Sequence, residues 1–289
     1  MSARQPKRRV AIVVDSAATV PDRFYDDTYT FSVPMLIHVG ERTYRDGVDI
    51  RSADFYTMQQ DHVGQTSTSA PTPGDFLAAF EKAAELAESI LCITVSNRFS
   101  SSLESAERAR QQFLTRRPGF DLRVLDSLTA VGAQGLIAWE ALKLATTGAC
   151  IDDVQLTALD TRQRVRLLAY VDTLYYLWKG GRVPAVAHLA TTLLKLKPIF
   201  QLEKSNVIQV ARPRTTTHAI SKLIALMKER IGEAPVHAMI MHAQVPEQAR
   251  SLSTMITREF EFAELFESEF TPVMGAHIGP GMVGVAFWS

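Results

Sequence analysis

The chain has 289 residues, and 46% of them are hydrophobic, which is enough apolar material for one large domain or two of ordinary size. Lysine plus arginine and aspartate plus glutamate both number 31, so the net charge is zero and the composition favours neither nucleic-acid binding nor more than transient contact with a membrane surface. No apolar run reaches the roughly 18 residues of a membrane-spanning helix, no secretion signal follows Met1, and the two cysteines favour reduced thiols, so we expect a cytoplasmic protein.

The first half of the chain alternates apolar runs with amphipathic segments, joined by short connections. Runs without polar alternation are typical of strands buried on both faces of a parallel sheet. We predict strands at residues 9–15, 31–39, 90–95 and 122–126, with Pro34 marking an edge or a bulge. Helices are predicted at residues 52–62 and 130–147, and two more are predicted to begin at residues 73 and 101. This alternation predicts an α/β fold whose first domain is a three-layer parallel sheet with flanking helices.

Two of these helices have recognisable N-termini. Thr72 as N-cap, Pro73 at the first helical position and Asp75 two residues later predict a helix start. Ser101 followed by Glu104 matches a capping box, which predicts that the next helix begins there. Residues 66–70, rich in hydroxyl groups, are predicted to form an exposed loop before the first of these helices.

After about residue 148 the pattern changes. A predicted hairpin at residues 197–212 is followed by alternating strands and helices, which predicts a second, smaller α/β domain with a mixed sheet and helices. We place the domains at residues 1–155 and 156–289. The predicted strands are 166–172, 197–203, 207–212, 236–242, 262–270 and 282–288, and the predicted helices are 152–164, a short helix ended by Gly180 and Gly181, 215–231 and 246–258.

Polar residues gather where the predicted parallel strands end. Open α/β sheets bind ligands at the carboxyl edge of their strands, and a helix N-terminus at that edge favours an anion. The sequence therefore predicts a polar rim, and the alternative for each residue is local capping of a turn. The rim residues are Asp15, Ser16, Ser69, Ser96, Ser100, Asp126 and Ser127.

Common cofactor and metal motifs are not present in the sequence. Residues 279–284 match G-x-G-x-x-G, but too little chain follows for the helix that must hold a dinucleotide. His237 and His242 fall on opposite faces of a predicted strand, which is poor for a shared metal. We therefore expect no metal and no cofactor. A serine hydrolase or acyltransferase acting on a lipid-like substrate, with Ser100, His277 and Asp126 as its triad, stays open because triads assemble from any chain positions.

Several short motifs follow one another in the order found in one bacterial family. Residues 14–16 resemble the family's opening T-D-S, and residues 68–76 resemble T-S-Q-P-S-P-G-E-F. Residues 96–106 resemble S-S-x-L-S-G-T-Y-Q-S-A, and further matches lie at 34–49, 179–182, 196–199 and 275–281. On these motifs the chain resembles the DegV family, the bacterial fatty-acid-binding proteins also called FakB-type.

The resemblance implies a lipid carrier rather than an enzyme. It implies two α/β domains with a long-chain fatty acid in an apolar tunnel between them, and no other cofactor. By motif position, Thr68, Ser100, Ser102 and His277 bind the carboxylate, and Arg182 is directed toward a kinase partner. That partner is a separate ATP-dependent fatty-acid kinase, which makes acyl phosphate for phospholipid synthesis.

The sequence departs from the family motifs at two positions near the expected carboxylate. Ala70 stands where the motif has glutamine, and Ser101 stands where it has glycine. Because glycine alone lets a ligand approach the backbone without a side chain in between, Ser101 is expected to change the geometry around the head group.

Overall fold

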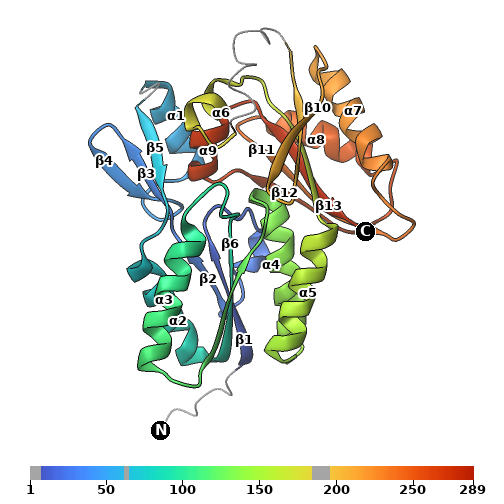
Figure 1. The fold of residues 1–289 in the computed structure, drawn as a ribbon. Coiled ribbons are helices and arrows are strands. Elements are labelled where there is room, and N and C mark those ends of the chain that lie inside the picture. The colour runs from blue at the N-terminus through green and yellow to red at the C-terminus, as the bar shows by residue number, and fades with distance from the viewer. Residues whose placement is uncertain (1–7, 62–64, 184–195) are drawn as a thin grey trace.

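The computed structural model describes residues 8–61, 65–183 and 196–289. Its N-terminal sheet has the strand order β2-β1-β6-β7, and every neighbouring pair is parallel. The predicted parallel sheet is confirmed (Figure 1). Its strands are β1 (Arg8–Asp15), β2 (Thr30–Val33), β6 (Ala87–Thr94) and β7 (Asp121–Asp126).

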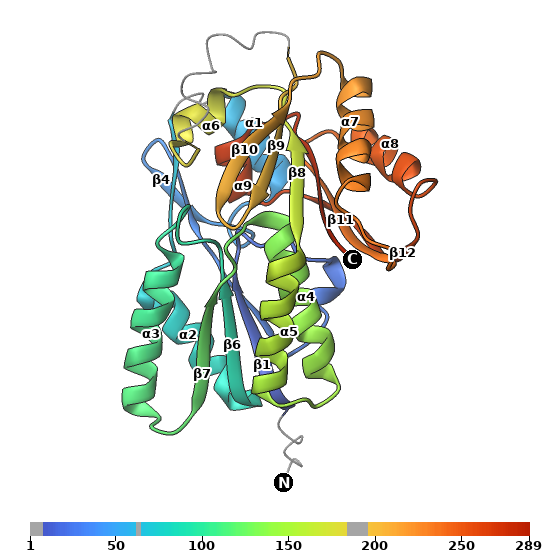
Figure 2. The same cartoon turned by 45° about the vertical axis from the view of Figure 1, so that its right-hand side comes forward.

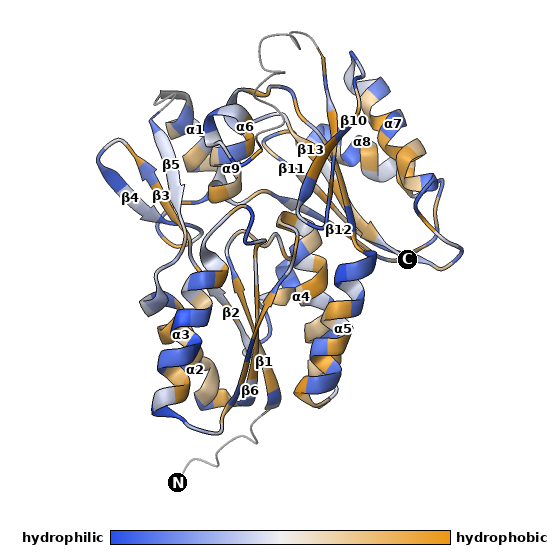
Figure 3. Ribbon diagram, viewed as in Figure 1, coloured by the Kyte–Doolittle hydropathy of each residue, from blue (hydrophilic) through white to orange (hydrophobic). Residues whose placement is uncertain are grey.

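Helices cover both faces of this sheet, as the uninterrupted apolar strands require. On β1, Val10, Ile12 and Val14 pack into one buried cluster. Ala11 and Val13 point to the opposite face of the sheet and pack into a second buried cluster. The first face is covered by α4 (Val131–Thr146) and α5 (Ile151–Arg164), and the second by α2 (Pro73–Leu86) and α3 (Ser102–Arg116). Figure 3 shows the strands as mainly hydrophobic and α3 as alternating between hydrophilic and hydrophobic residues.

The second sheet is mixed, with the order β10-β9-β8-β13-β11-β12, and only β11 and β12 run parallel. With six strands it is larger than the first sheet rather than smaller. Helices α7 (Thr216–Lys228) and α8 (Pro246–Ile256) cover one face, and the other face is directed toward α4 (Figure 2). The strands are β8 (Arg166–Tyr170), β9 (Ile199–Glu203), β10 (Asn206–Ala211), β11 (Val236–His242), β12 (Phe262–Glu269) and β13 (Val283–Trp288).

A third, antiparallel sheet of order β4-β3-β5 was not expected, and helices separate it from the second sheet (Figure 1). The predicted single strand at 31–39 is wrong, because the chain leaves the first sheet after β2 and enters the third one at β3. Pro34 has no N–H for a ladder, and the Met35 amide instead donates to Ser16 Oγ at 3.0 Å. The strands are β3 (Leu36–Val39), β4 (Arg42–Arg45) and β5 (Thr66–Ser69).

Helix α9 (Pro272–Ile278) packs on this small sheet, and α1 (Ser52–Asp61) and α6 (Tyr175–Gly180) pack on α9. A 3-10 turn (Asp22–Phe24) precedes β2. The expected exposed loop at 66–70 is wrong, because residues 66–69 form β5 and pair with β3. Residue 62, the expected last residue of α1, lies outside the described residues.

Two further local expectations differ from the structure. Ser101 occupies the N-cap of α3 as predicted, but its side chain makes no capping hydrogen bond, so the capping box with Glu104 is not formed. By contrast, Thr72 accepts from the Asp75 amide, and Asp75 accepts from the Thr72 amide at 2.8 Å, which confirms the predicted start of α2. The predicted domain boundary at 155/156 falls inside α5, which packs on α4, and it stays a prediction.

Among the described residues, no helix has both the length and the apolar character needed to cross a bilayer. The expected cytoplasmic location stays a prediction.

Candidate ligand-binding cavity

A cavity of about 360 Å³ lies between the N-terminal sheet, the second sheet and α9. A volume of this size falls within the range of small-molecule sites. Most of its wall is apolar and comes from distant parts of the chain. The apolar lining includes Ala17, Met35, Val95, Val131, Leu167, Ala169, Phe200, Leu202, Val207, Val273, Met274 and Met282.

A few polar side chains interrupt this apolar wall, and they include three of the residues predicted to bind a carboxylate. Thr68 lies on β5, Ser100 on the loop after β6, and His277 in the last turn of α9. Thr68 Oγ1 and His277 Nε2 are 2.6 Å apart, across 209 positions of sequence. The structure therefore brings two predicted residues into direct contact and places the third on the same cavity wall. The complete polar lining is Thr68, Ser69, Ser100, Ser101, Arg182 and His277.

His277 is a neutral imidazole at neutral pH. Burial lowers its pKa to about 4, and the positive charge of Arg182 adds to the effect. Its Nδ1 atom is buried and has no hydrogen-bond partner among the described residues. If the Thr68 hydroxyl donates to Nε2, then Nδ1 carries the ring proton and is available as a donor. His277 thus offers a hydrogen bond rather than a positive charge.

Ser102 acts behind Ser100 rather than on the cavity wall. It is fully buried, and its hydroxyl lies 3.0 Å from that of Ser100. The Ser102 hydroxyl also hydrogen bonds with the carboxylate of Asp15, whose pKa burial raises to about 6. Asp15 accepts from the Val95 amide at 2.8 Å as well. This chain of contacts fixes the Ser100 hydroxyl on the scaffold of the first sheet.

Arg182, after α6, and Ser69, at the end of β5, both line the cavity. Arg182 is exposed, and its guanidinium donates to the Gly180 carbonyl at 2.7 Å. Ser69 Oγ lies 3.0 Å from His38 Nε2. Both positions that depart from the family motifs, Ala70 and Ser101, also line the cavity. Ser101 has an ordinary φ of −79°, so replacing glycine there adds a side chain without backbone strain.

The other predicted rim residues do not line the cavity, and their side chains are used within the scaffold. Ser16 donates to Asp46 at 2.6 Å, and Ser96 Oγ lies 2.7 Å from Ser205 Oγ. Asp126 accepts from the Leu128 amide at 2.8 Å, and Ser127 donates to the Thr129 carbonyl at 3.1 Å. The contacts of Asp126 and Ser127 match the local-capping alternative, whereas Ser16 and Ser96 contact residues distant in sequence. These four residues are not part of the site that we propose.

The serine-hydrolase triad is not assembled. His277 Nε2 contacts Thr68 rather than Ser100, and no carboxylate among the described residues contacts Nδ1 to orient the ring. Asp126 accepts from the Leu128 amide of its own turn and from the Asn97 amide in the loop after β6. A general base needs both the nucleophile and an orienting group within hydrogen-bond reach, and neither contact is present.

Sequence reasoning did not identify which apolar residues form the cavity. The strands β8, β9 and β10 were predicted, but periodicity alone does not tell which face of a sheet packs on helices and which faces a ligand. Asp46 was also missed. It is buried, accepts from Ser16 and from the Val273 amide, and so joins β4 to the start of α9. No motif marks it, because its partners lie far apart in sequence.

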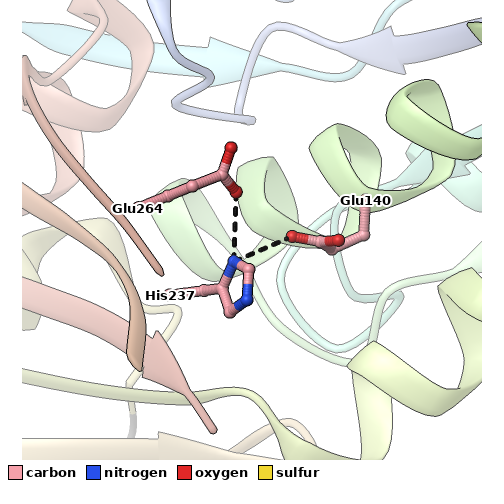
Figure 4. Close-up of side chains that lie close together, drawn as sticks. All are labelled: Glu140, His237 and Glu264. Atoms are coloured by element: carbon pink, nitrogen blue, oxygen red, sulfur yellow. Dashed lines mark hydrogen bonds and ion pairs between the residues drawn. The ribbon is translucent and has the colours of Figure 1, made fainter. Parts of the chain in front are cut away.

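Glu140, His237 and Glu264 form a separate cluster between α4 and the second sheet, and their oxygen and nitrogen atoms lie within 4.8 Å of one another (Figure 4). His237 Nδ1 is 3.0 Å from Glu264 and 3.4 Å from Glu140. The Lys143 ammonium lies 2.9 Å from Glu140 and 2.6 Å from Glu264. Because this ammonium already pairs with both carboxylates, we assign the cluster to packing of α4 on the sheet and not to a metal.

Lys143→Met is expected to lower the free energy of unfolding by about 1–3 kcal/mol at pH 7, because it leaves two partly buried carboxylates without their cation. Burial raises the pKa of Glu264, but hydrogen bonds from Lys143, Trp139 and His237 outweigh it and lower that pKa below 4.5. This stabilisation is present above pH 4.5 and is lost as the pH falls through the lowered pKa. Urea unfolding at pH 7 and at pH 3.5 measures both effects.

Arg250→Met is the matched control, because Arg250 pairs with Glu247 on the surface, where both side chains are more than half exposed. Its effect is expected to stay below about 0.5 kcal/mol. Equal losses in the two variants would show that the α4 cluster contributes no more than a surface ion pair.

Comparisons with known proteins agree with this arrangement. The family model described as "Uncharacterised protein, DegV family" matches residues 9–289. A DegV domain-containing protein of Streptomyces coelicolor is 32% identical over 280 residues, which are 96% of this chain and 98% of that protein. The solved structure of a DegV family protein from Thermus thermophilus, described as fatty-acid binding, has a TM-score of 0.89 at 25% identity and covers 97% of this chain and 99% of its own.

The solved structure of Bacillus subtilis DegV, described as a fatty acid binding protein, gives a TM-score of 0.86 at 26% identity, with 98% of this chain and 99% of its own covered. The family match extends over nearly the whole chain, and both solved relatives share its architecture along their full length. The chain belongs to the DegV family.

Proposed function

We propose that this protein binds a long-chain fatty acid in the main cavity and presents its carboxylate to a separate fatty-acid kinase. One observation carries the proposal: an apolar cavity of about 360 Å³ whose wall is interrupted by Thr68, Ser100 and His277. The fatty-acid binding of the Thermus thermophilus and Bacillus subtilis relatives supports it. The protein acts as a carrier in this role, and the chemistry belongs to the partner.

The apolar wall supplies most of the affinity. Each buried methylene contributes about 0.8 kcal/mol, so a long acyl tail contributes roughly 10 kcal/mol before the cost of ordering it. A hydrogen bond to a charged group contributes about 1.5–3 kcal/mol. The tail therefore decides how tightly the acid binds, and the polar residues decide where its carboxylate lies.

The polar end suits a carboxylate that must still react. Thr68 and Ser100 are neutral hydroxyls, and His277 is a neutral imidazole, so they hold the anion without the bidentate ion pair that would occupy both of its oxygens. In the kinase complex a carboxylate oxygen attacks the γ-phosphorus of ATP. The bond between that phosphorus and the β,γ-bridging oxygen breaks, and ADP leaves. The product is an acyl phosphate for phospholipid synthesis.

Denaturing extraction of the purified chain, followed by mass spectrometry, tests the first part of this proposal. We expect close to one long-chain fatty acid for each protein chain. A chain that releases no lipid, and that also fails to bind palmitate or oleate after delipidation, would contradict fatty-acid binding. Labelling with a fluorophosphonate separates the hydrolase alternative, since a serine hydrolase reacts covalently at one serine and a carrier does not.

A further inference from the structure

A second, smaller cavity of about 60 Å³ lies directly beside the main one, and its function is not explained by fatty-acid binding. Arg182 and His277 line both cavities, so the two cavities meet at the end of the main cavity where these two residues lie. The character of its lining is different, since hydroxyl and cationic side chains predominate. These are Thr66, Ser67, Tyr175, Tyr176, Lys179 and Arg182.

The lining of the second cavity is that of an anion site. Four hydroxyl groups, one ammonium and one guanidinium line it, and none of the described residues that line it carries a carboxylate. Each water requires about 10–15 Å³ of such volume, so the cavity has room for about four to six waters. A PO₃ group has four heavy atoms. The cavity is thus too small for an acyl chain or a nucleotide but matches one phosphoryl group.

Two buried polar atoms on its wall have no hydrogen-bond partner among the described residues. They are Thr66 Oγ1 and His277 Nδ1. The His277 ring lies at the boundary between the two cavities. Its Nε2 atom hydrogen bonds with Thr68, and its Nδ1 atom faces Gly180, since a Cβ added to Gly180 would lie 2.7 Å from Nδ1. Buried donors without a partner are unfavourable, and oxygens of a ligand in this cavity are the acceptors that they lack.

We propose that the second cavity binds the phosphoryl group of an acyl phosphate whose tail lies in the main cavity. This inference rests on the proposed function, because phosphorylation of the carboxylate at Thr68 and His277 extends the head group past the shared wall. The phosphoryl oxygens accept from His277 Nδ1, from Thr66 and from the two tyrosines, and the two cations balance their charge. The carrier then holds its product more tightly than its substrate.

Competitive titration of the delipidated full-length chain tests this preference. The probes are palmitate and the ketophosphonate in which a methylene group replaces the bridging oxygen of palmitoyl phosphate, so that it does not hydrolyse. We expect the phosphonate to bind about 10-fold or more tightly than palmitate at pH 7.5, which is the discrimination that one or more charge-assisted hydrogen bonds provide.

Thr66→Val and Lys179→Met are expected to lower phosphonate affinity about 5-fold or more and to change palmitate affinity less than 2-fold. Valine suits the β5 position of Thr66, and Lys82→Met, at an exposed position on α2, is the matched control for Lys179. If palmitate itself does not bind, the proposed function fails. If palmitate binds but the phosphonate binds no more tightly, or the variants weaken both ligands equally, the phosphoryl site is overturned.

Discussion

Ala169→Phe is expected to lower the affinity for a C16 or C18 fatty acid by about 100-fold or more. Ala169 lies on β8, is 5% exposed and lines the main cavity. Its neighbour across the sheet on β13 is Gly284, which has no side chain to collide with a larger residue. A phenyl group therefore extends into the space that the acyl chain needs. Losing the burial of four or five methylenes costs about 3–4 kcal/mol.

Titration of the delipidated variant with fatty acids of increasing length measures this effect. The loss is expected to grow with chain length, because a short acid does not need the volume that the phenyl group fills. Ala263→Phe is the matched control, since Ala263 is exposed on β12 of the same sheet, and it should leave affinity unchanged. A uniform loss at every chain length would indicate altered folding, and unchanged affinity for C18 acids would contradict this cavity as the acyl site.

Thr68→Val and Ser100→Ala are expected to slow acyl-phosphate formation about 10- to 100-fold and to weaken fatty-acid binding by less than about 10-fold. The tail supplies most of the binding free energy, so it stays bound when one hydroxyl is lost. The carboxylate, however, loses a group that positions it for in-line attack, and small displacements of a reacting atom have large effects on rate. Valine keeps the shape of threonine, so the variant removes the hydrogen bond with His277 and little else.

The measurement combines the loaded carrier with its cognate ATP-dependent kinase and traps the acyl phosphate with hydroxylamine, while a separate titration gives fatty-acid affinity. Thr43→Val is the control, because Thr43 lies on β4 of the same small sheet and its hydroxyl is 2.9 Å from a different histidine, His38. Unchanged turnover in both site variants would contradict the positioning role. A loss of affinity as large as the loss of turnover would show that these hydroxyls bind rather than position.

Where the decisive contacts are local, sequence reasoning was reliable. Thr72, Pro73 and Asp75 predicted the start of α2, because an N-cap needs only side chains and amides within one helical turn. The apolar runs predicted β1, β6 and β7 in parallel, since strands buried on both faces leave no polar alternation. The motif order also predicted the family, which the match over residues 9–289 confirms.

Local reasoning failed where a residue distant in sequence supplies the hydrogen-bond partner of a backbone group. Residues 31–39 were predicted as one strand, but the strand is interrupted at Pro34, because the Met35 amide donates to Ser16 Oγ. Residues 66–69 read as a loop, but β3 supplies the ladder that makes them a strand. The Ser100 and Ser102 hydroxyls interact with each other, and the capping role expected for Ser101 is not realised.

The sequence by itself determined the class of the fold and the family, because motifs and periodicity are properties of short segments. It also singled out Thr68, Ser100 and His277, three polar residues that line the main cavity. Only the tertiary structure decided that Thr68 and His277 touch, that His277 is neutral, and that a second polar cavity lies beyond it. These features depend on packing α9 against β5 and α6 against α9, elements about 90 or more positions apart in sequence. Burial and contacts between such elements arise only when the chain is folded, so no local pattern encodes them.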